Sequence, residues 1–400
     1  SYGACKEDKL DILFFGGACD PVHRGHENIL KAALNYKKFD KIIVMPTGTP
    51  GHKRRCRLPF ALRKKMAEIA FDKICDGIEV SGYEGEKLGK SYSYITVDRL
   101  KEKYPEADVY FLIGGDSALA LDKWKKREYL QKNVVFLIAQ REQNEEKELN
   151  SALKRIQKYS PNSRIIKTEV MPISSTELRE KLTEERPAED YIDRDVLKYI
   201  QENHLYSRDY YERNIGIAKR LIPLLLREKR AAHTKNVADL ARKFAKKYGE
   251  NPDKAYLAGL LHDIQKEADR DIVVARSVRS DDEERIRSKN YPVLHGFAAA
   301  DFAKYEMDID DPDLLMSLKS HTCGRPGMST LEKIIYLADM LSRERDFPEK
   351  DYLLNLAWQD LDVAMDRALA DSIKWLKDRG DGLDNDSVEA YNYFEAKLKK

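Results

Sequence analysis

The sequence predicts an α/β doubly wound parallel sheet in the N-terminal half and an all-α bundle in the C-terminal half. Up to about residue 141, short apolar runs rich in β-branched and aromatic residues alternate with longer stretches of helical periodicity. After residue 204, apolar residues recur only at helical spacing. A length of 400 residues with 42% hydrophobic residues gives enough material for a separate core in each half.

Five apolar runs of the N-terminal half have the near-continuous hydrophobicity of strands buried on both faces. These strands are expected at Ile12–Phe15, Ile42–Met45, Ile78–Val80, Val109–Ile113 and Val134–Ala139. Amphipathic helices are expected between them. A further strand near Arg164–Val170 and a helix beginning at Ser175 should complete this half.

The polar stretch at residues 204–212 is where the two patterns change. We expect one domain at 10–206 and a second at 212–395, with no internal repeat. Two charged or polar stretches, Gln140–Leu149 and Ser277–Lys289, are expected to be mobile insertions.

Composition excludes several classes of protein. The chain has 71 Lys plus Arg against 69 Asp plus Glu, a balance that does not favour nucleic-acid binding. No apolar run approaches the roughly 18 residues of a membrane-spanning helix. The 5 cysteines are scattered without a CxxC pair, which is typical of reduced thiols and predicts a cytoplasmic protein. A homo-oligomer is compatible with the sequence.

The first candidate site follows the first predicted strand, in GGACDPVHRGH at 16–26. Gly16 and Gly17 permit a sharp turn and a close backbone approach to a ligand. His23 and His26 are three residues apart, so they would share one face of a first helical turn. Such a helix start at the carboxyl end of a strand can bind phosphate. The simpler alternative is an ordinary turn with two surface histidines.

This segment resembles the GGxFDPxHxGH signature of the nucleotidyltransferase superfamily, in particular that of the bacterial nicotinate-mononucleotide adenylyltransferases. Four more segments resemble family motifs in the same order: PTGTPGHK, GKSYSYITVDRL, IGGDSALALDKW and ISSTELR. The chain departs from the family pattern at Ala18-Cys19 and at Gly51. The resemblance covers residues 10–206 and implies a Rossmann-like fold.

The same resemblance implies adenylyl transfer from ATP to nicotinate mononucleotide, with deamido-NAD and pyrophosphate as products and Mg²⁺ accompanying ATP. It gives catalytic roles at the phosphates to His23, His26 and Lys53. Nucleotide-binding roles fall on these two histidines and on Gly16, Gly17, Ser93, Gly115, Asp116, Trp124, Ser174, Ser175, Thr176 and Arg179. Trp124 could instead be a core residue. Helix capping by the ISST segment is compatible with phosphate binding.

The second candidate site is a set of histidines and aspartates in the helical half, in apolar or glycine-flanked settings. They are His233, His262, Asp263, His295, His321 and Asp339. Buried carboxylates and imidazoles are costly unless they are paired or bind a metal. A single such histidine would suggest a satisfied core hydrogen bond, whereas this many on separate helices indicate a metal centre.

His233, the doublet His262-Asp263 and Asp339 resemble the H…HD…D signature of the HD-domain phosphohydrolases. The additional His295 and His321 resemble the versions that bind two metals. LLHDIQKE, HTCGRPGMSTLEKIIYLAD and RDFP are similar to bacterial symmetrical diadenosine-tetraphosphate hydrolases, which implies cleavage to two ADP.

Nitrogen and oxygen ligands of this kind suit two transition-metal ions, iron first and manganese or cobalt as alternatives. Asp263 would then be both ligand and catalytic residue. Lys266 and Arg325 are further catalytic candidates for gripping the polyphosphate, or else they are solvated surface charges.

The sequence therefore predicts a bifunctional enzyme that binds ATP, nicotinate mononucleotide and diadenosine tetraphosphate. Two alternatives remain for the first half: an enzyme acting on nicotinamide mononucleotide, or another adenylyl- or cytidylyltransferase. For the second half, the alternatives are hydrolysis of another nucleotide and a helical sensor that binds metal and nucleotide without turnover.

Overall fold

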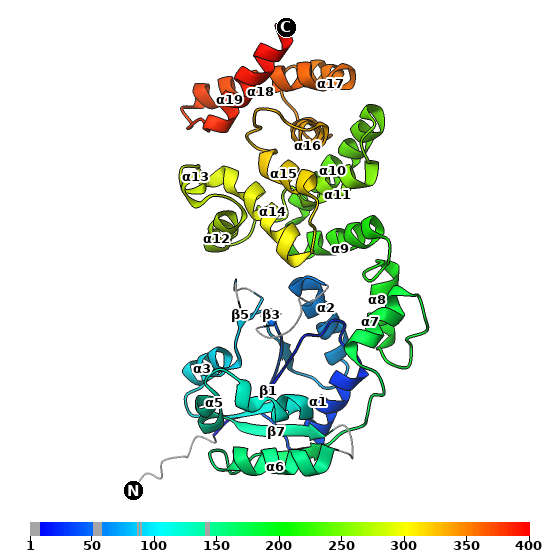
Figure 1. The fold of residues 1–400 in the computed structure, drawn as a ribbon, viewed down its shortest axis with the longest axis vertical. Coiled ribbons are helices and arrows are strands. Elements are labelled where there is room, and N and C mark those ends of the chain that lie inside the picture. Colours follow the sequence, from blue (N-terminus) through cyan, green and yellow to red (C-terminus); the bar gives the residue numbers. More distant parts are fainter. Residues whose placement is uncertain (1–8, 51–57, 86–87, 89, 141–144) are drawn as a thin grey trace. The chain divides into compact units, whose positions relative to one another are not determined.

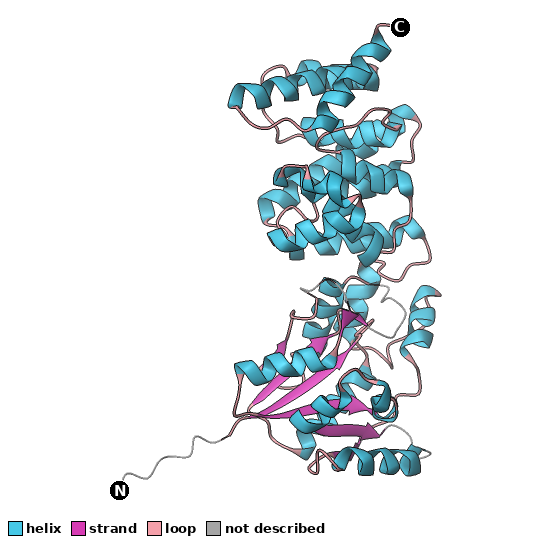
Figure 2. Cartoon of the chain, turned by 60° about the vertical axis from the view of Figure 1, so that its left-hand side comes forward, coloured by secondary structure: helices cyan, strands magenta, loops and turns pink. Residues whose placement is uncertain are grey.

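The computed structural model describes residues 9–50, 58–85, 88, 90–140 and 145–400. It divides into two compact units. The first comprises Ser1–Glu202 with Tyr206–Arg208, and the second comprises Asn203–Leu205 with Asp209–Lys400. The strands lie in the first unit, whereas the second unit is helical (Figure 2).

The first unit is built on a six-stranded sheet in which every neighbouring pair is parallel. Its strands are β1 (Asp11–Gly17), β2 (Lys41–Pro46), β4 (Ile78–Val80), β6 (Asp108–Gly114), β7 (Val135–Gln140) and β8 (Arg164–Lys167). They are ordered β4-β2-β1-β6-β7-β8, which is the doubly wound Rossmann-like order. This confirms the predicted fold class of the first half.

Helices cover both faces of this sheet (Figure 1). The helices are α1 (Arg24–Tyr36), α2 (Phe60–Phe71), α3 (Ser93–Lys103), α4 (Gly115–Leu119), α5 (Arg127–Asn133), α6 (Glu146–Gln157), α7 (Ser175–Thr183) and α8 (Arg194–Glu202). A short second sheet pairs β3 (Thr49–Pro50) with β5 (Lys90–Ser91).

Side chains alternate between the two faces of the sheet, as the strand period requires. Phe14 stacks on Phe111 of the neighbouring strand with ring centroids 4.5 Å apart, in a core that also contains buried residues of α3, α5 and α6. On the opposite face, Phe15 lies edge-on to Phe71 of α2 and contacts His26 of α1. The first histidine site is therefore anchored to the sheet's core.

The second unit is described from its first to its last residue and contains helices and no strand, which confirms the predicted all-α half. Its helices are α9 (Tyr210–Leu225), α10 (Glu228–Tyr248), α11 (Pro252–Leu261), α12 (Arg270–Ser280), α13 (Glu283–Arg287), α14 (Leu294–Glu306), α15 (Pro312–Ser320), α16 (Thr330–Leu341), α17 (Lys350–Gln359), α18 (Leu361–Arg379) and α19 (Asn385–Leu398).

The stretch Ser277–Lys289, expected to be a mobile insertion, is mostly helical. The polar residues of this stretch end α12 and begin α13: Asp282 accepts a hydrogen bond from the Arg285 backbone as the cap of α13. Ser277 is buried and donates to the carbonyl of Val273. The other mobile insertion, expected at Gln140–Leu149, lies partly outside the described residues. The last part of this stretch forms the beginning of α6.

Among the described residues, no helix is both long enough and apolar enough to cross a lipid bilayer.

Candidate active sites

The first site is a cavity of about 690 Å³ at the carboxyl ends of β1 and β6. The chain leaves β1 toward one edge of the sheet and reaches β6 on the other side, which makes this the switch point where doubly wound sheets bind ligands. Gly16, Gly17, Ser93, Asp116 and Trp124 all line the cavity, so the structure brings these five predicted residues together. Trp124 also packs 6.0 Å from the Phe111 ring.

Gly115 is buried at the first position of α4, just below the cavity lining. A Cβ added there would lie 3.0 Å from Oε2 of Glu145 and 3.4 Å from Leu149. Gly115 therefore permits the close packing of α4 against α6 that brings Asp116 to the cavity.

The two histidines of the first motif form the start of α1. His23 is the N-cap residue, and its Nδ1 accepts from the backbone of Gly25 at 3.1 Å. Nδ1 of His26 accepts from the backbone of His23 at 3.1 Å, and the two rings are in contact, tilted by 38° with centroids 3.9 Å apart. Both rings are buried, and Nε2 of His23 lies 3.0 Å from Oγ of Ser175. The prediction of a helix start here is confirmed; the catalytic role of the histidines stays a prediction.

The ISST segment forms the start of α7. Ser174 caps the helix, because its Oγ accepts from the Glu177 backbone and its own N–H donates to the Glu177 carboxylate. Arg179 donates to the Asp20 carbonyl at 2.8 Å and to Oγ1 of Thr176 at 3.2 Å. The helix start is thereby held against the loop that follows β1. Lys53 lies outside the described residues.

Sequence reasoning missed Arg63 of α2, whose side chain is buried among backbone carbonyls. It donates to the carbonyls of Ala18 at 2.6 Å, Thr47 at 2.7 Å, Gly48 at 3.1 Å and Leu58 at 3.0 Å. Ala18 and Thr47 line the nucleotide-sized cavity. One guanidinium thus fixes the loops that follow β1 and β2.

A sequence signal for Arg63 did exist. Arg63 shares a helical face with Met66, Ala67 and Ala70, which are all buried. A charged residue on a buried face is rarely fully buried without partners, so its position indicates that it has them. Glu84 was missed as well: it is buried, lines the same cavity and accepts from Oγ1 of Thr96 at 2.9 Å.

The second site gathers all six predicted histidines and aspartates into one cluster. His233 comes from α10, His262-Asp263 follow α11, His295 lies on α14, His321 follows α15 and Asp339 lies on α16. The helices α10 and α11 approach closely at Gly259, where an added Cβ would lie 2.5 Å from Cα of Ala238. This close approach brings the ring of His233 to within 5.4 Å of the ring of His262.

Asp263 lies at the centre of the cluster and is 3% exposed. Its Oδ2 is 3.8 Å from Nε2 of His233 and 3.5 Å from Nε2 of His262. Its Oδ1 is 3.0 Å from Nε2 of His295 and 3.7 Å from Nε2 of His321. The two carboxylate oxygens therefore face two different pairs of imidazoles.

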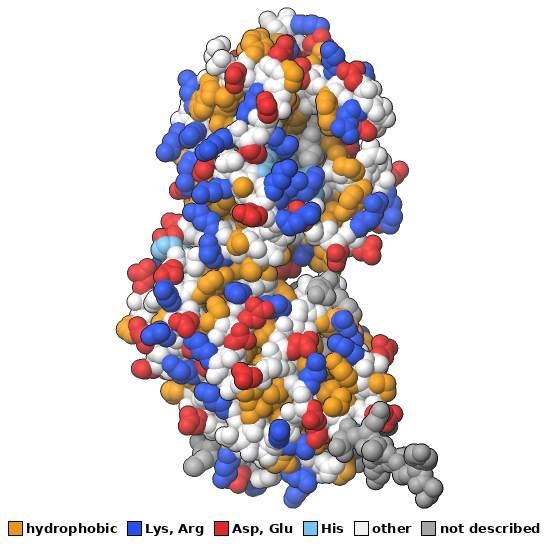
Figure 3. Space-filling view, turned by 180° about the vertical axis from the view of Figure 1, so that it is seen from behind, with side chains coloured by type: hydrophobic (Ala, Val, Ile, Leu, Met, Phe, Trp, Pro, Cys, Tyr) orange, Lys and Arg blue, Asp and Glu red, His pale blue; other side chains and the backbone are white. Residues whose placement is uncertain are grey.

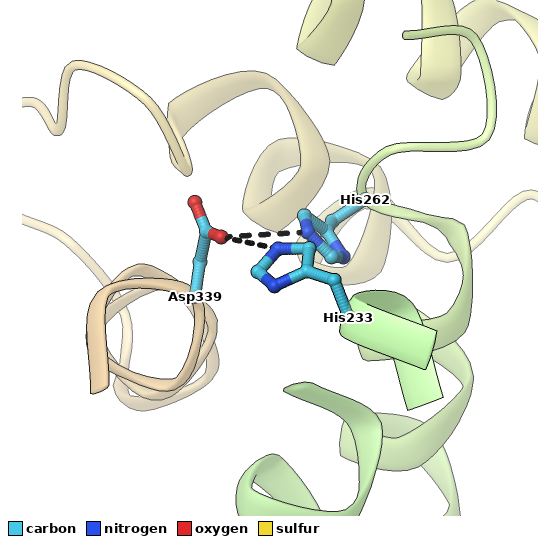
Figure 4. Close-up of side chains that lie close together, drawn as sticks. All are labelled: His233, His262 and Asp339. Carbon is cyan, nitrogen blue, oxygen red and sulfur yellow. Dashed lines mark hydrogen bonds and ion pairs between the residues drawn. The ribbon is translucent and has the colours of Figure 1, made fainter. Parts of the chain in front are cut away.

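Asp339 faces the first of these pairs, with Oδ1 2.9 Å from Nε2 of His233 and 3.6 Å from Nε2 of His262 (Figure 4). Nε2 of His262 is buried and has no hydrogen-bond partner among the described residues. The ligand atoms of His233, His262 and Asp339 lie within 4.8 Å of one another, as do those of His262, Asp263 and His321. An unsatisfied imidazole nitrogen among carboxylates fits a divalent metal ion.

The outer nitrogens of three cluster histidines face backbone carbonyls three residues earlier. The Nδ1 atoms of His262, His295 and His321 are 2.6, 2.9 and 2.7 Å from the carbonyl oxygens of Gly259, Pro292 and Leu318. A hydrogen bond from Nδ1 leaves the lone pair of Nε2 directed inward, which is the usual arrangement of metal-binding histidines.

Burial and charge oppose each other in the cluster. Burial disfavours ionisation of Asp263, but the nearby histidines hold its pKa well below the usual range, and the same balance lowers the pKa of Asp339. Burial also opposes the charged form of His262, yet the two carboxylates raise its pKa to about 9. Burial lowers the pKa of His295 to about 4. Both carboxylates are therefore ionised, which is the form that binds a cation.

A cavity of about 570 Å³ opens beside His233, and its lining holds three carboxylates, Glu267, Glu344 and Asp346, besides four basic residues. The basic residues are Arg227, Lys229, Arg230 and Arg345. Arg230 contacts Oδ2 of Asp263 at 2.9 Å, and Arg345 contacts Oδ1 of Asp339 at 3.2 Å. Basic side chains gather around a hollow in the helical unit where a histidine is visible (Figure 3). Sequence reasoning gave none of these four residues a role, although Arg345 begins the RDFP segment that resembles the hydrolases.

The predicted Lys266 and Arg325 are placed differently. Nζ of Lys266 lies 3.2 Å from Nδ1 of His295, and burial lowers the pKa of this lysine. Arg325 makes a bidentate ion pair with the buried carboxylate of Glu332, at 2.6 and 2.7 Å. Neither residue lines the basic cavity, so their role in gripping the polyphosphate stays a prediction.

The fold and the two sites define a Rossmann-like α/β unit with a cavity at the sheet switch point, joined to a helical unit with a buried histidine–aspartate cluster that could hold a metal ion. The cytidylyltransferase-like family model matches residues 14–181, and the HD domain model matches residues 230–344. Of the relatives, a Clostridium tetani protein named probable nicotinate-nucleotide adenylyltransferase is 32% identical over 194 residues, which are 48% of this chain and 96% of that protein. The chain belongs to the nicotinate-nucleotide adenylyltransferase family, through its N-terminal half.

Other relatives extend across both units. A Mycoplasma genitalium protein named probable nicotinate-nucleotide adenylyltransferase/Ap4A hydrolase is 28% identical over 371 residues, which are 89% of this chain and 96% of that protein. Among solved structures, a predicted HD superfamily hydrolase involved in NAD metabolism from Clostridium acetobutylicum is 36% identical, with a TM-score of 0.43. It covers 45% of this chain, and the match spans 96% of that protein.

Proposed function

We propose that the chain is a bifunctional enzyme. One activity transfers the adenylyl group of ATP to nicotinate mononucleotide, and the other hydrolyses diadenosine tetraphosphate (Ap4A) to two ADP. The observation that carries the proposal is the presence of two separate sites, a nucleotide-sized cavity at a sheet switch point and a buried histidine–aspartate cluster beside a basic cavity. A relative that carries both activities in its name aligns with 89% of the chain.

In the transferase reaction, a phosphate oxygen of nicotinate mononucleotide attacks the α-phosphorus of ATP. The bond from this phosphorus to the bridging oxygen of the β-phosphate breaks, and pyrophosphate leaves. No covalent enzyme intermediate is needed, so the protein contributes alignment and charge stabilisation. His23 and His26 would hold the phosphates from the start of α1, and the adjacent start of α7 would hold them together with Arg179. Mg²⁺ enters with ATP.

In the hydrolase, His233, His262 and Asp339 would hold one ion and His295 with His321 a second. Asp263 would serve both, since each of its oxygens faces one set. Such ions supply an activated water and polarise the phosphoryl group. Iron is the proposed ion, with manganese or cobalt as alternatives, because the ligands are nitrogen and oxygen atoms.

Arg230 and Arg345 reach from the basic cavity to the two cluster carboxylates. They can therefore orient a polyphosphate at the point where the cavity meets the cluster, with bidentate contacts from each guanidinium. In this arrangement the chain of phosphates would lie next to the cluster and the nucleosides outside it.

Paired assays test the transferase. Nicotinate and nicotinamide mononucleotide are supplied separately with ATP and Mg²⁺, and pyrophosphate is measured. A higher kcat/KM for the nicotinate substrate supports the proposal. A preference for the nicotinamide substrate, or activity only with another phosphorylated acceptor or CTP, contradicts it.

A substrate panel tests the hydrolase. The full chain is loaded with Fe²⁺ or Mn²⁺ and given Ap4A, deoxynucleoside triphosphates and guanosine polyphosphates. Turnover of Ap4A at the highest kcat/KM supports the assignment. Tight binding of Ap4A without turnover, together with an altered transferase rate, would instead favour a regulatory sensor. We also propose a cytoplasmic location, where these nucleotides are found.

A further inference from the structure

The four cluster histidines differ in what holds their outer nitrogen. Three of them face neutral backbone carbonyls, and Nδ1 of His295 also lies 3.2 Å from Nζ of Lys266. Nδ1 of His233 instead contacts a carboxylate oxygen, Oε1 of Glu344. Glu344 lies just after α16 in a segment that the sequence patterns did not single out, and no assigned function uses it.

The Glu344 carboxylate is itself held at both oxygens. Nδ2 of Asn236 donates to Oε2 at 2.8 Å, and Oγ of Ser342 donates to Oε1 at 2.7 Å. Asn236 lies three residues after His233 on α10, so one helical turn carries both the imidazole and a donor to its partner. The side chain of Glu344 is 37% exposed at the mouth of the basic cavity, while that of His233 is 7% exposed.

We propose that Glu344 is a positioning residue for metal binding: it keeps the proton of His233 on Nδ1 and makes Nε2 a stronger ligand. This inference rests on the proposed metal centre. A carboxylate that accepts from Nδ1–H fixes the tautomer and raises the basicity of the other nitrogen more than a neutral carbonyl does. Its effect is confined to the ion held by His233, His262 and Asp339.

Among the described residues, none other than Glu344 offers a carboxylate to Nδ1 of His233. Oγ of Ser342 is 3.4 Å from Nδ1 of His233, but a hydroxyl can donate as well as accept and so does not select a tautomer. If Glu344 is lost, Nε2 of His233 can carry the proton toward Asp339, 2.9 Å away, in place of binding a metal.

The test measures Mn²⁺ binding to the metal-stripped full chain, with unbound Mn²⁺ followed by electron paramagnetic resonance. The variants are Glu344→Gln, which keeps an acceptor but removes the charge, and Glu344→Ala, which removes both. Glu267→Gln is the matched control: Glu267 lines the same cavity, but its carboxylate pairs with Arg227 at 3.1 Å.

We expect two Mn²⁺ per wild-type chain. In Glu344→Ala one of the two should bind about 10- to 100-fold more weakly, with a smaller loss in Glu344→Gln. The second ion, and both ions of Glu267→Gln, should keep wild-type Kd values.

Unchanged Kd values in Glu344→Ala would reject the positioning role while leaving the metal centre intact. Equal weakening of both ions with a lower Tm would show a general structural role and would also reject it. A wild-type chain that binds no Mn²⁺ would overturn the metal centre itself, and this inference with it.

Discussion

The two sites are built on opposite principles. The transferase site takes its geometry from the backbone: strand ends, helix starts and two loops held by Arg63 surround its cavity. The hydrolase site is an assembly of buried side chains from distant helices, with His233 and Asp339 separated by 106 positions. A site built from the backbone loses activity gradually as single side chains are removed. A buried charged cluster is strongly destabilised when one charge is removed, because its partner is left buried without a counter-charge.

The largest effect is expected from Asp263→Ala. This change removes the carboxylate that lies between both pairs of imidazoles. Because metal polarisation is worth several kcal/mol, Ap4A hydrolysis should fall by about a thousandfold or more. Elemental analysis should show less than one bound ion, and adenylyl transfer should stay at the wild-type rate. Retained metal would overturn the ligand assignment.

His26→Ala should have the next largest effect, on the other activity. It removes a buried ring that contacts the ring of His23 and accepts a hydrogen bond from the His23 backbone. Adenylyl transfer should fall by about 100- to 1000-fold, the usual cost of losing one group that stabilises transition-state charge. The hydrolase in the same preparation serves as the folding control. If the hydrolase falls equally, the separation of the two sites is contradicted.

Arg63→Met tests whether the backbone of the transferase site depends on one buried guanidinium. Four carbonyls lose their donor, and each buried acceptor left unsatisfied costs about 1–3 kcal/mol. We expect a stability loss of about 3 kcal/mol or more and a raised KM for both transferase substrates. Arg63→Lys should recover part of the stability and part of the wild-type KM. Chemical denaturation and steady-state kinetics supply the measurements, and an unchanged KM in Arg63→Met would contradict this role.

A smaller effect is expected from two lysines that each bind two carboxylates. Lys254 of α11 pairs with Asp311 and Asp313 and is 14% exposed, whereas Lys73 pairs with Asp193 and Asp195 and is 44% exposed. Because burial reduces screening, Lys254→Met should cost about 1–2 kcal/mol. Lys73→Met should cost less. Equal losses in denaturant titrations would contradict the argument from burial.

The ion pairs of Lys254 also make the stability of the fold depend on pH. Burial opposes ionisation of Asp311, but Lys254 and the backbone N–H groups of α15 hold its carboxyl pKa below the usual range. A lowered carboxyl pKa stabilises the fold above the unfolded value of about 4, and this stabilisation is lost as the pH falls below that value. Lys254→Met should therefore flatten the loss of stability with acid, measured as the denaturation midpoint against pH.

Much of this architecture could be predicted from local sequence. The strands were predictable because continuous apolar runs mark a sheet covered on both faces, and the order of segments then indicated the doubly wound class. The cluster ligands were predictable because several histidines and aspartates in apolar helices would be too costly to bury without a metal or a charged partner. The metal centre followed from these residue types, whereas the reactions followed from the resemblance of the motifs to known families.

The missed residues share one physical reason. Arg63, Glu344 and the basic residues of the hydrolase cavity act through contacts formed only when distant segments meet. Their charges look like ordinary surface charges in a chain that is 35% charged. The stretch Ser277–Lys289 was misassigned for a related reason, since its polar residues serve as helix caps and buried hydrogen-bond donors.

The most direct test of the account is product analysis of Ap4A hydrolysis by the full chain loaded with Fe²⁺ or Mn²⁺. Separation of the nucleotides by anion-exchange chromatography should show ADP as the sole product, which supports both the metal centre and symmetrical cleavage. ATP plus AMP would contradict the symmetrical assignment. No turnover with metal bound would contradict the hydrolase.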